Sequence, residues 1–322
     1  MIRRPPRSTQ GVSSAASDVY KRQGSFLAAH VATPRRGVAV QVNAFNFPCW
    51  GALEKLAPAL LAGLPTIVKP ATPTAFLTEA MVRLIVDSGI LPDGALQLIC
   101  GGAGDLFDHL DGQDSVGFTG SATTAALLRT HPGIVDRSVR FNAEADSLNA
   151  ALLGPSAEPG TPEFGLFVAE VVREMTVKAG QKCTAIRRAL VPRSHLETVT
   201  EALASALAEV RVGDPSNPDT DMGALVSTGQ RDEVRAAISD LCTTTNVVVD
   251  TCTFRDVDPA IGAFLAPTLL RASDSEAGPV HDVEAFGPVC TLVGYDDPDP
   301  VSYTHLRAHE TRHDLVCRLL LE

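Results

Sequence analysis

Apolar positions in the first half of the chain follow two alternating patterns. Short apolar runs bounded by turn residues predict buried strands, and longer segments with apolar residues every three or four positions predict helices. The expected strands are 38–42, 66–68, 95–99, 115–118 and 150–153, and the expected helices are 51–62, 73–88 and 122–128. This alternation predicts an α/β fold with a largely parallel sheet and helices on both faces.

A second set of elements follows the proline-containing stretch 155–162, which is typical of a linker or surface loop. Helices are expected at 163–178, 196–211 and 231–242, and strands at 189–191 and 247–249. We therefore divide the folded part into two α/β domains, residues 24–160 and 161–300. Parallel sheets bind ligands at the carboxyl ends of their strands. The sequence lacks a G-x-G-x-x-G fingerprint, and the glycine cluster at 101–104 is more typical of a plain turn.

The two ends of the chain differ from the rest. Segment 1–23 has five basic residues and one acidic residue, and no apolar periodicity. It resembles either a transit peptide or the translation of sequencing-adapter DNA, and tail 301–322 resembles the latter. We expect both segments to be non-native or disordered. The tail contains His309, Glu310 and His313 in an H-E-x-x-H string, but it offers no folded cleft, so we assign no metal site.

Composition narrows the class of protein. Hydrophobic residues make up 45% of the chain and charged residues 20%, which suits a folded protein with a sizeable core. The net charge of −11 argues against nucleic-acid binding, and no apolar run approaches the roughly 18 residues of a membrane helix. The seven scattered cysteines form no Cys-x-x-Cys pair, so we expect free thiols in a reducing, cytoplasmic compartment.

One cysteine stands in polar, glycine-containing surroundings. Cys183 follows a predicted helix, and Lys178 and Lys182 are expected to favour its thiolate, the reactive form of the side chain. A buried structural thiol is the plain alternative. Three other cysteines lie in apolar runs and are expected to be structural: Cys49, Cys100 and Cys290.

Five short segments stand in a fixed order within residues 46–289. They are Asn-Phe-Pro at 46–48, Val-Lys-Pro-Ala at 68–71, Phe-Thr-Gly-Ser at 118–121, Gly-Gln-Lys-Cys at 180–183 and Glu-Ala-Phe-Gly-Pro-Val at 284–289. Together they resemble motifs of the aldehyde dehydrogenase superfamily, with Phe45 in place of the usual Trp. The resemblance implies a partial NAD(P)-binding domain of Rossmann type at 24–160 and a partial catalytic domain at 161–300. It also implies that the parent protein is a homo-oligomer.

A narrower resemblance involves segments 43–50, 144–149 and 178–188. They are similar to the aldehyde dehydrogenase half of bifunctional ring-opening proteins of bacterial phenylacetate degradation. In those proteins the other half is a hydratase that opens an oxepin-CoA ring, and it is absent from this sequence. The resemblance implies oxidation of a CoA-linked semialdehyde to the acid, with NADP as cofactor and NAD as a possible substitute. Another aliphatic semialdehyde as substrate, and an inactive nucleotide-binding fragment, remain alternatives.

The resemblance assigns catalytic roles to three residues. Cys183 would attack the aldehyde as a thiolate, because hydride leaves a tetrahedral thiohemiacetal more readily than an aldehyde. The Asn46 amide and the Cys183 N–H would stabilise the oxyanion. Glu144 would be the general base for thioester hydrolysis. The family's E-L-G-G segment is here Glu-Ala-Asp-Ser, so Asp146 is an alternative base.

The resemblance also implies a set of cofactor contacts: Lys69, Thr72, Gly120, Ser121, Glu284 and Phe286. Lys69 would bind the adenosine ribose, and Ser121 would meet the pyrophosphate at a helix start or serve simply as an N-cap. Thr72 stands where the family often has Glu, and the loss of that negative charge would make NADP acceptable. Glu284 would bind the nicotinamide ribose, with Phe286 beside the ring, although a plain turn is the alternative.

Overall fold

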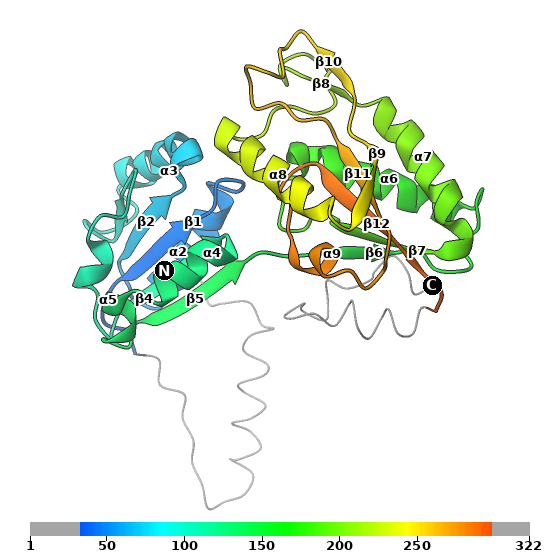
Figure 1. Cartoon of the computed structure of the whole chain (residues 1–322). Coiled ribbons are helices and arrows are strands. Elements are labelled where there is room, and N and C mark those ends of the chain that lie inside the picture. Colours follow the sequence, from blue (N-terminus) through cyan, green and yellow to red (C-terminus); the bar gives the residue numbers. More distant parts are fainter. Residues whose placement is uncertain (1–32, 298–322) are drawn as a thin grey trace, which may run out of the picture.

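The computed structural model describes residues 33–297, which form two α/β units, each built around its own five-stranded sheet (Figure 1). The expected α/β fold is confirmed. The predictions for segments 1–23 and 301–322 and for the H-E-x-x-H string concern residues outside this range. Within 33–297, no helix is both long enough and apolar enough to cross a membrane.

The first sheet is parallel throughout, with the strand order β3-β2-β1-β4-β5. Its strands are β1 (Ala39–Asn43), β2 (Thr66–Pro70), β3 (Leu96–Leu98), β4 (Ser115–Gly120) and β5 (Arg140–Ala145). The connecting helices are α2 (Trp50–Leu61), α3 (Ala75–Asp87), α4 (Ala122–Arg129) and α5 (Pro132–Val135), with short 3₁₀ turns η1 (Thr72–Thr74) and η2 (Leu106–His109). The chain passes from β1 to opposite sides of the sheet through β2 and β4, so their carboxyl ends border the crevice where such sheets bind ligands.

Two apolar layers fix this sheet between its helices. On one face, Ala52 and Leu56 of α2 pack with Val82 of α3 over Val68 and Leu96 of the sheet. A second cluster contains Val40 of β1 and Val116 of β4, packed against residues from η2 and α5. Strand β5 was missing from the sequence prediction. Its residues Arg-Phe-Asn-Ala-Glu-Ala are only exposed or half-buried, so it carries no apolar run.

The second sheet has the order β6-β7-β12-β11-β9, in which β9 alone is antiparallel to its neighbour. Its strands are β6 (Ala150–Leu152), β7 (Arg188–Pro192), β9 (Thr245–Val249), β11 (Thr268–Ala272) and β12 (Val289–Tyr295). Around it lie α6 (Pro162–Thr176), η3 (Val177–Gly180), η4 (Arg193–His195), α7 (Leu196–Ala208), α8 (Thr228–Leu241) and α9 (Gly278–Asp282), with a small ladder of β8 (Arg211–Gly213) and β10 (Thr253–Arg255). The large core joins α6, α7, β11 and β12.

The strand expected at 150–153 differs from its predicted place. We expected it within the first domain, whereas β6 pairs in parallel with β7 of the second sheet. Residues 146–149 therefore connect the two sheets, and Figure 1 shows this passage between β5 and β6. Apolar runs alone do not distinguish the two sheets, because buried strands of both carry the same pattern.

Candidate active site

The loop after β1 lies against the segment that precedes Cys183. The Lys178 ammonium donates a hydrogen bond to the carbonyl oxygen of Asn46 at 2.7 Å. The same ammonium lies 3.6 Å from the ring centre of Phe47, a favourable cation–π contact. Phe45 makes a second contact between the units, because its ring meets that of Phe286 edge-on, with 5.8 Å between the ring centres. The expected oxyanion residue Asn46 and the expected nucleophile thus come from different sheets to the same region.

The nucleophile loop has an unusual backbone. Lys178, Ala179 and Gly180 all have positive φ, between 51° and 67°, a region that residues with a side chain rarely adopt. Cys183 follows in a turn in which the Ala185 N–H donates to the carbonyl oxygen of Lys182. The backbone of Gly180 packs directly on that of Gly287, and a Cβ atom at position 180 would lie 2.0 Å from the Gly287 oxygen. The glycine therefore allows the loop to touch the 284–289 motif.

We expect Gly180→Ala to lower the free energy of unfolding by about 3 kcal/mol, through the backbone overlap and the left-handed φ. Urea unfolding followed by circular dichroism measures the change. Gly165→Ala is the matched control, because Gly165 lies inside α6 and a Cβ there has nothing within 4 Å. That control should be unchanged or up to about 1 kcal/mol more stable. Equal stabilities of the two variants would contradict the prediction.

Three polar residues that the sequence did not single out support this loop: Arg187, which is buried, and Ser147 and Asn149, which are half-buried. The Arg187 guanidinium donates to the carbonyl oxygens of Gly180, Lys182 and Gly287. The carbonyl oxygen of Cys183 accepts hydrogen bonds from the Ser147 hydroxyl and the Asn149 amide, both in the passage between the sheets. Positively charged and amide side chains close to a predicted nucleophile were the available signal, but the sequence does not show which carbonyls they reach.

The electrostatics around Cys183 differ from the expectation. Burial raises the pKa of the Cys183 thiol above its ordinary value, and the negative charge of Glu144 raises this pKa further. The raised pKa shows that burial and nearby carboxylates dominate, and the expected help of Lys178 and Lys182 to the thiolate stays a prediction. Lys182 is buried and its ammonium pairs with the Glu174 carboxylate at 2.7 Å, while Lys178 is engaged with Asn46.

We expect alkylation of Cys183 by iodoacetamide to become faster with rising pH even above the ordinary thiol range, because the raised pKa keeps the thiol protonated. Glu144→Gln removes one negative charge, so its rate profile should move to lower pH. Peptide mass spectrometry measures the rates, with the exposed thiol of Cys242 as the internal reference. A profile that stays in place, or moves to higher pH, would contradict this electrostatic assignment.

Cys183 is half-buried, and of the cysteines expected to be structural, one is buried and another is exposed. Cys290 is fully buried, which raises its pKa to about 12 and fits the structural role expected of it. Cys100 is exposed, so the expectation of a buried structural thiol is wrong there. It follows directly on β3, where the chain leaves the sheet.

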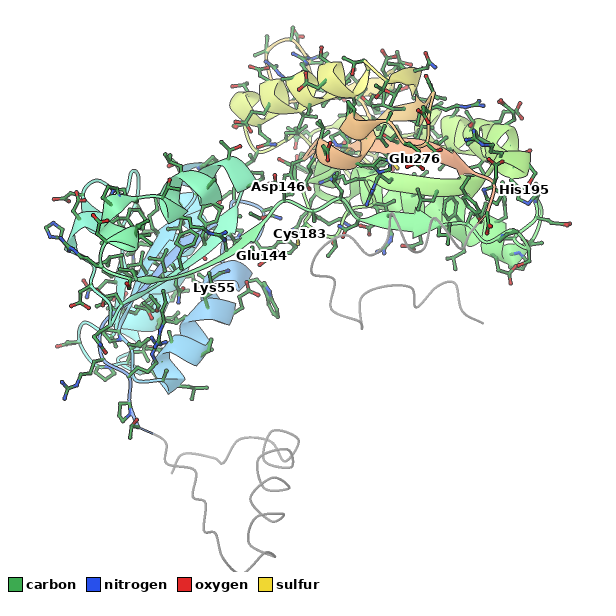
Figure 2. The ribbon with its side chains drawn as sticks, turned by 60° about the horizontal axis from the view of Figure 1, so that its bottom comes forward. Lys55, Glu144, Asp146, Cys183, His195 and Glu276 are labelled. Atoms are coloured by element: carbon green, nitrogen blue, oxygen red, sulfur yellow. The ribbon has the colours of Figure 1, made fainter. Side chains whose placement is uncertain are left out.

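The two candidate bases are in different surroundings. Glu144 is exposed on β5, close enough to Cys183 to influence its thiol, and within residues 33–297 its carboxylate makes no hydrogen bond or ion pair (Figure 2). The Asp146 carboxylate instead accepts a hydrogen bond from the Ala122 N–H at 2.8 Å. Asp146 has a φ of 45°, so it keeps the left-handed backbone that glycine adopts easily and Asp tolerates. The structure thus leaves Glu144 available and Asp146 occupied.

The expected cofactor contacts of the first sheet gather at its carboxyl edge. Lys69 lies near the end of β2, and burial lowers the pKa of its ammonium. Thr72 is exposed at the start of η1. Gly120 ends β4, and Ser121 caps α4 by accepting a hydrogen bond from the Thr124 N–H.

This edge is chemically suited to a dinucleotide. It offers a positive charge at Lys69 and the positive end of the α4 helix dipole. Asn43 and Thr119, at the ends of β1 and β4, have buried polar atoms without a partner among the described residues. These features fit a polar ligand, and the individual contacts stay predictions.

Glu284 and Phe286 come from the second unit. The Glu284 carboxylate is buried, accepts a hydrogen bond from the Ser147 N–H at 3.0 Å and lies 3.4 Å from the Arg187 guanidinium. Burial raises the pKa of Glu284, and the charge of Arg187 opposes this rise. The Arg187 guanidinium also faces the Phe286 ring, at 5.3 Å. Glu284 therefore anchors the passage between the sheets, and its role toward a ribose stays a prediction.

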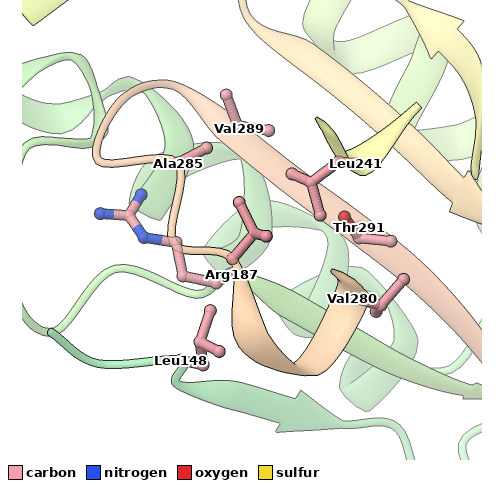
Figure 3. Close-up of a pocket in the computed structure, with 8 residues that line it drawn as sticks. Leu148, Arg187, Leu241, Val280, Ala285, Val289 and Thr291 are labelled. Atoms are coloured by element: carbon pink, nitrogen blue, oxygen red, sulfur yellow. The ribbon is translucent and has the colours of Figure 1, made fainter. Parts of the chain in front are cut away.

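A small cavity lies behind Arg187, between α8, α9 and β12 (Figure 3). Its volume is about 10 Å³, which is room for about one water molecule. Its lining includes Leu148, Leu241 and Val280, and does not include Cys183. It is therefore a packing defect of the second unit and does not hold a substrate.

Comparison with known proteins agrees with this arrangement. The chain is 51% identical to a 3,4-dehydroadipyl-CoA semialdehyde dehydrogenase of Aromatoleum evansii, over 89% of this chain and 55% of that protein. A crystal structure of apo betaine aldehyde dehydrogenase from Staphylococcus aureus superposes with a TM-score of 0.73 at 27% identity, over 83% of this chain and 52% of that one. A complex of the same Staphylococcus aureus enzyme with NAD⁺ gives a TM-score of 0.71 at 26% identity, over 81% and 51%.

The chain thus spans about half the length of the relatives that it matches. The model of the aldehyde dehydrogenase family matches residues 10–302, most of the sequence. The expected fold, the order of the motifs and this match agree, and the chain belongs to the aldehyde dehydrogenase family.

Proposed function

We propose that the protein oxidises a CoA-linked semialdehyde to the corresponding acid, with NAD(P)⁺ as oxidant and Cys183 as the nucleophile. The observation that carries this proposal is the contact between the two units: the ammonium of Lys178 joins the loop of Asn46 to the loop of Cys183. This contact supports a site in which the Cys183 thiol and the Asn46 loop meet, with the Glu144 carboxylate close enough to influence the thiol.

In the first half of the reaction, the Cys183 thiolate attacks the aldehyde carbon and forms a tetrahedral thiohemiacetal oxyanion. We assign stabilisation of the negative oxygen to the Asn46 side-chain amide and the Cys183 N–H, and each such donor is typically worth about 3 kcal/mol. NAD(P)⁺, when bound, accepts the hydride that leaves this carbon, and the substrate becomes a thioester of Cys183.

In the second half, water attacks the thioester carbonyl and Glu144 takes up the proton of that water. The C–S bond then breaks, the acid leaves and the Cys183 thiolate returns. A carboxylate close to the sulfur has a double effect, because the same charge that raises the thiol pKa also attracts a proton from water. This favours hydrolysis to a free acid over transfer of the acyl group to CoA.

The substrate class rests on the 51% identity to a protein named for a CoA-linked semialdehyde. A free aliphatic semialdehyde is the second candidate, since the betaine aldehyde dehydrogenases are named for an aldehyde that is not linked to CoA. For the cofactor, Thr72 stands three residues after Lys69, where the family often has Glu. Without the negative charge of that Glu, a 2′-phosphate is not repelled, which supports NADP⁺ alongside NAD⁺.

The test is an assay of NAD(P)H formation at 340 nm with matched pairs of substrates, each semialdehyde offered as the free acid and as its CoA thioester. We expect the CoA-linked member of each pair to have the higher kcat/KM. Equal or higher values for the free semialdehydes would support the second candidate. Cofactor binding without turnover of any aldehyde would overturn the proposal in favour of a nucleotide-binding fragment.

A further inference from the structure

Asp146 occupies the end of the helix that the cofactor is expected to approach. The strands β4 and β5 stay in register up to the pair Gly120 and Ala145, so the next residue of each strand lies at the same edge. On one side that residue is Ser121, which caps α4, and on the other it is Asp146. The Asp146 carboxylate accepts a hydrogen bond from the first N–H of α4, that of Ala122.

The backbone around Asp146 keeps this carboxylate in place. Before it, β5 is bonded to β4, and after it the Ser147 N–H donates to the Glu284 carboxylate. Asp146 itself has the left-handed φ of 45°. The side chain can rotate, but its Cα atom is fixed near the start of α4, so its negative charge stays near that helix end whatever binds there.

Side chains already accept from two of the N–H groups in the first turn of α4. Asp146 accepts from Ala122, the Ser121 hydroxyl accepts from Thr124, and the Ser121 carbonyl accepts from Ala125. A helix N-terminus attracts one anion at a time, since its partial positive charge extends only over the first turn. A carboxylate and a pyrophosphate that meet there compete for the same donors and repel each other.

We propose that Asp146 sets the affinity of this chain for its dinucleotide, by opposing the pyrophosphate at the N-terminus of α4. This inference rests on the proposed function, because only a ligand whose phosphates reach α4 senses the charge. It also assigns Asp146 a role other than general base. Asp146 weakens binding of NADP⁺ and NAD⁺ alike, since both carry the pyrophosphate, and it leaves binding of adenosine unchanged.

The test is isothermal titration of the full 322-residue chain. Asp146→Asn removes the charge, keeps an oxygen that can accept from Ala122, and tolerates the left-handed backbone. We expect its Kd for NADP⁺ and for NAD⁺ to fall about fivefold, the size of one charge at a helix end. Asp146→Gly, which restores the residue usual in the family, should bind at least as tightly.

The control is Asp93→Asn, an equal change of charge on an exposed residue before β3, at the opposite end of the strands. It should bind both dinucleotides as the wild type does. A Kd of Asp146→Asn within twofold of the wild type, or higher than it, overturns the inference while cofactor binding stands. If neither protein binds NADP⁺ or NAD⁺, the proposed function fails as well. Binding by Asp146→Asn alone supports the inference strongly.

Discussion

Replacement of Cys183 by Ala should lower aldehyde-dependent NADPH formation more than about a thousandfold, because in the proposed mechanism the Cys183 sulfur forms the covalent intermediate. Cofactor binding should persist, since the thiol lies on the second unit and the expected phosphate contacts lie on the first. The rate is measured as absorbance at 340 nm with a CoA-linked semialdehyde. The acyl adduct on wild-type protein is measured by intact mass.

Cys242→Ala is the matched control, because it removes an exposed thiol that ends α8, away from the proposed nucleophile. It should keep the wild-type rate and, like the wild type, gain the mass of one acyl group. If Cys183→Ala kept more than a tenth of the rate, the covalent mechanism would be wrong. If the adduct mapped to another cysteine, the assignment of the nucleophile would be wrong instead.

Replacement of Glu144 by Gln should separate the two halves of the reaction. The thiolate attack and hydride loss need no base, so one equivalent of NADPH per chain should still appear in a rapid burst. Hydrolysis of the thioester should then slow by about a hundredfold to a thousandfold. Rapid-mixing absorbance gives the size of the burst and the steady rate, and mass spectrometry detects the acyl-enzyme that accumulates.

Glu54→Gln provides the comparison for charge alone. Glu54 is an exposed carboxylate of α2 that pairs with Lys55, and its charge also influences Cys183, but more weakly than that of Glu144. This variant should show no burst and an ordinary steady rate. An equal burst in both variants would mean that loss of a nearby negative charge, and not of a base, slows hydrolysis. Loss of the burst in Glu144→Gln would mean that Glu144 acts before the thioester forms.

The sequence predicted the fold class correctly, because apolar periodicity and short motifs can be read from the sequence alone, while the roles of the candidate site residues stay predictions. Strand β5 escaped, since an edge strand with only half-buried and exposed positions carries no apolar run. Strand β6 was predicted but assigned to the wrong sheet, because the sequence of a strand of three residues does not reveal which strand it pairs with.

The charges were the least predictable part of the site. Lys182 is the neighbour of Cys183 in sequence, yet its ammonium reaches back to Glu174 on α6 and is neutralised there. Asp146 stood in the sequence as a possible base, and the structure shows it bound to the N–H of Ala122, 24 residues earlier. A sequence shows which charges are present, whereas their effect on a thiol depends on which partner each one finds in three dimensions.

The buried pair of Lys182 and Glu174 also has a mechanical consequence. Because Lys182 precedes Cys183, this ion pair connects the backbone beside the proposed nucleophile to a fifteen-residue helix, and we expect it to restrict movement of the sulfur. A restricted backbone at Cys183 would not adjust to acyl chains of different lengths. Under the proposed function, we therefore expect substitutions that leave the pair of Lys182 and Glu174 intact to be the ones that change the range of aldehydes oxidised.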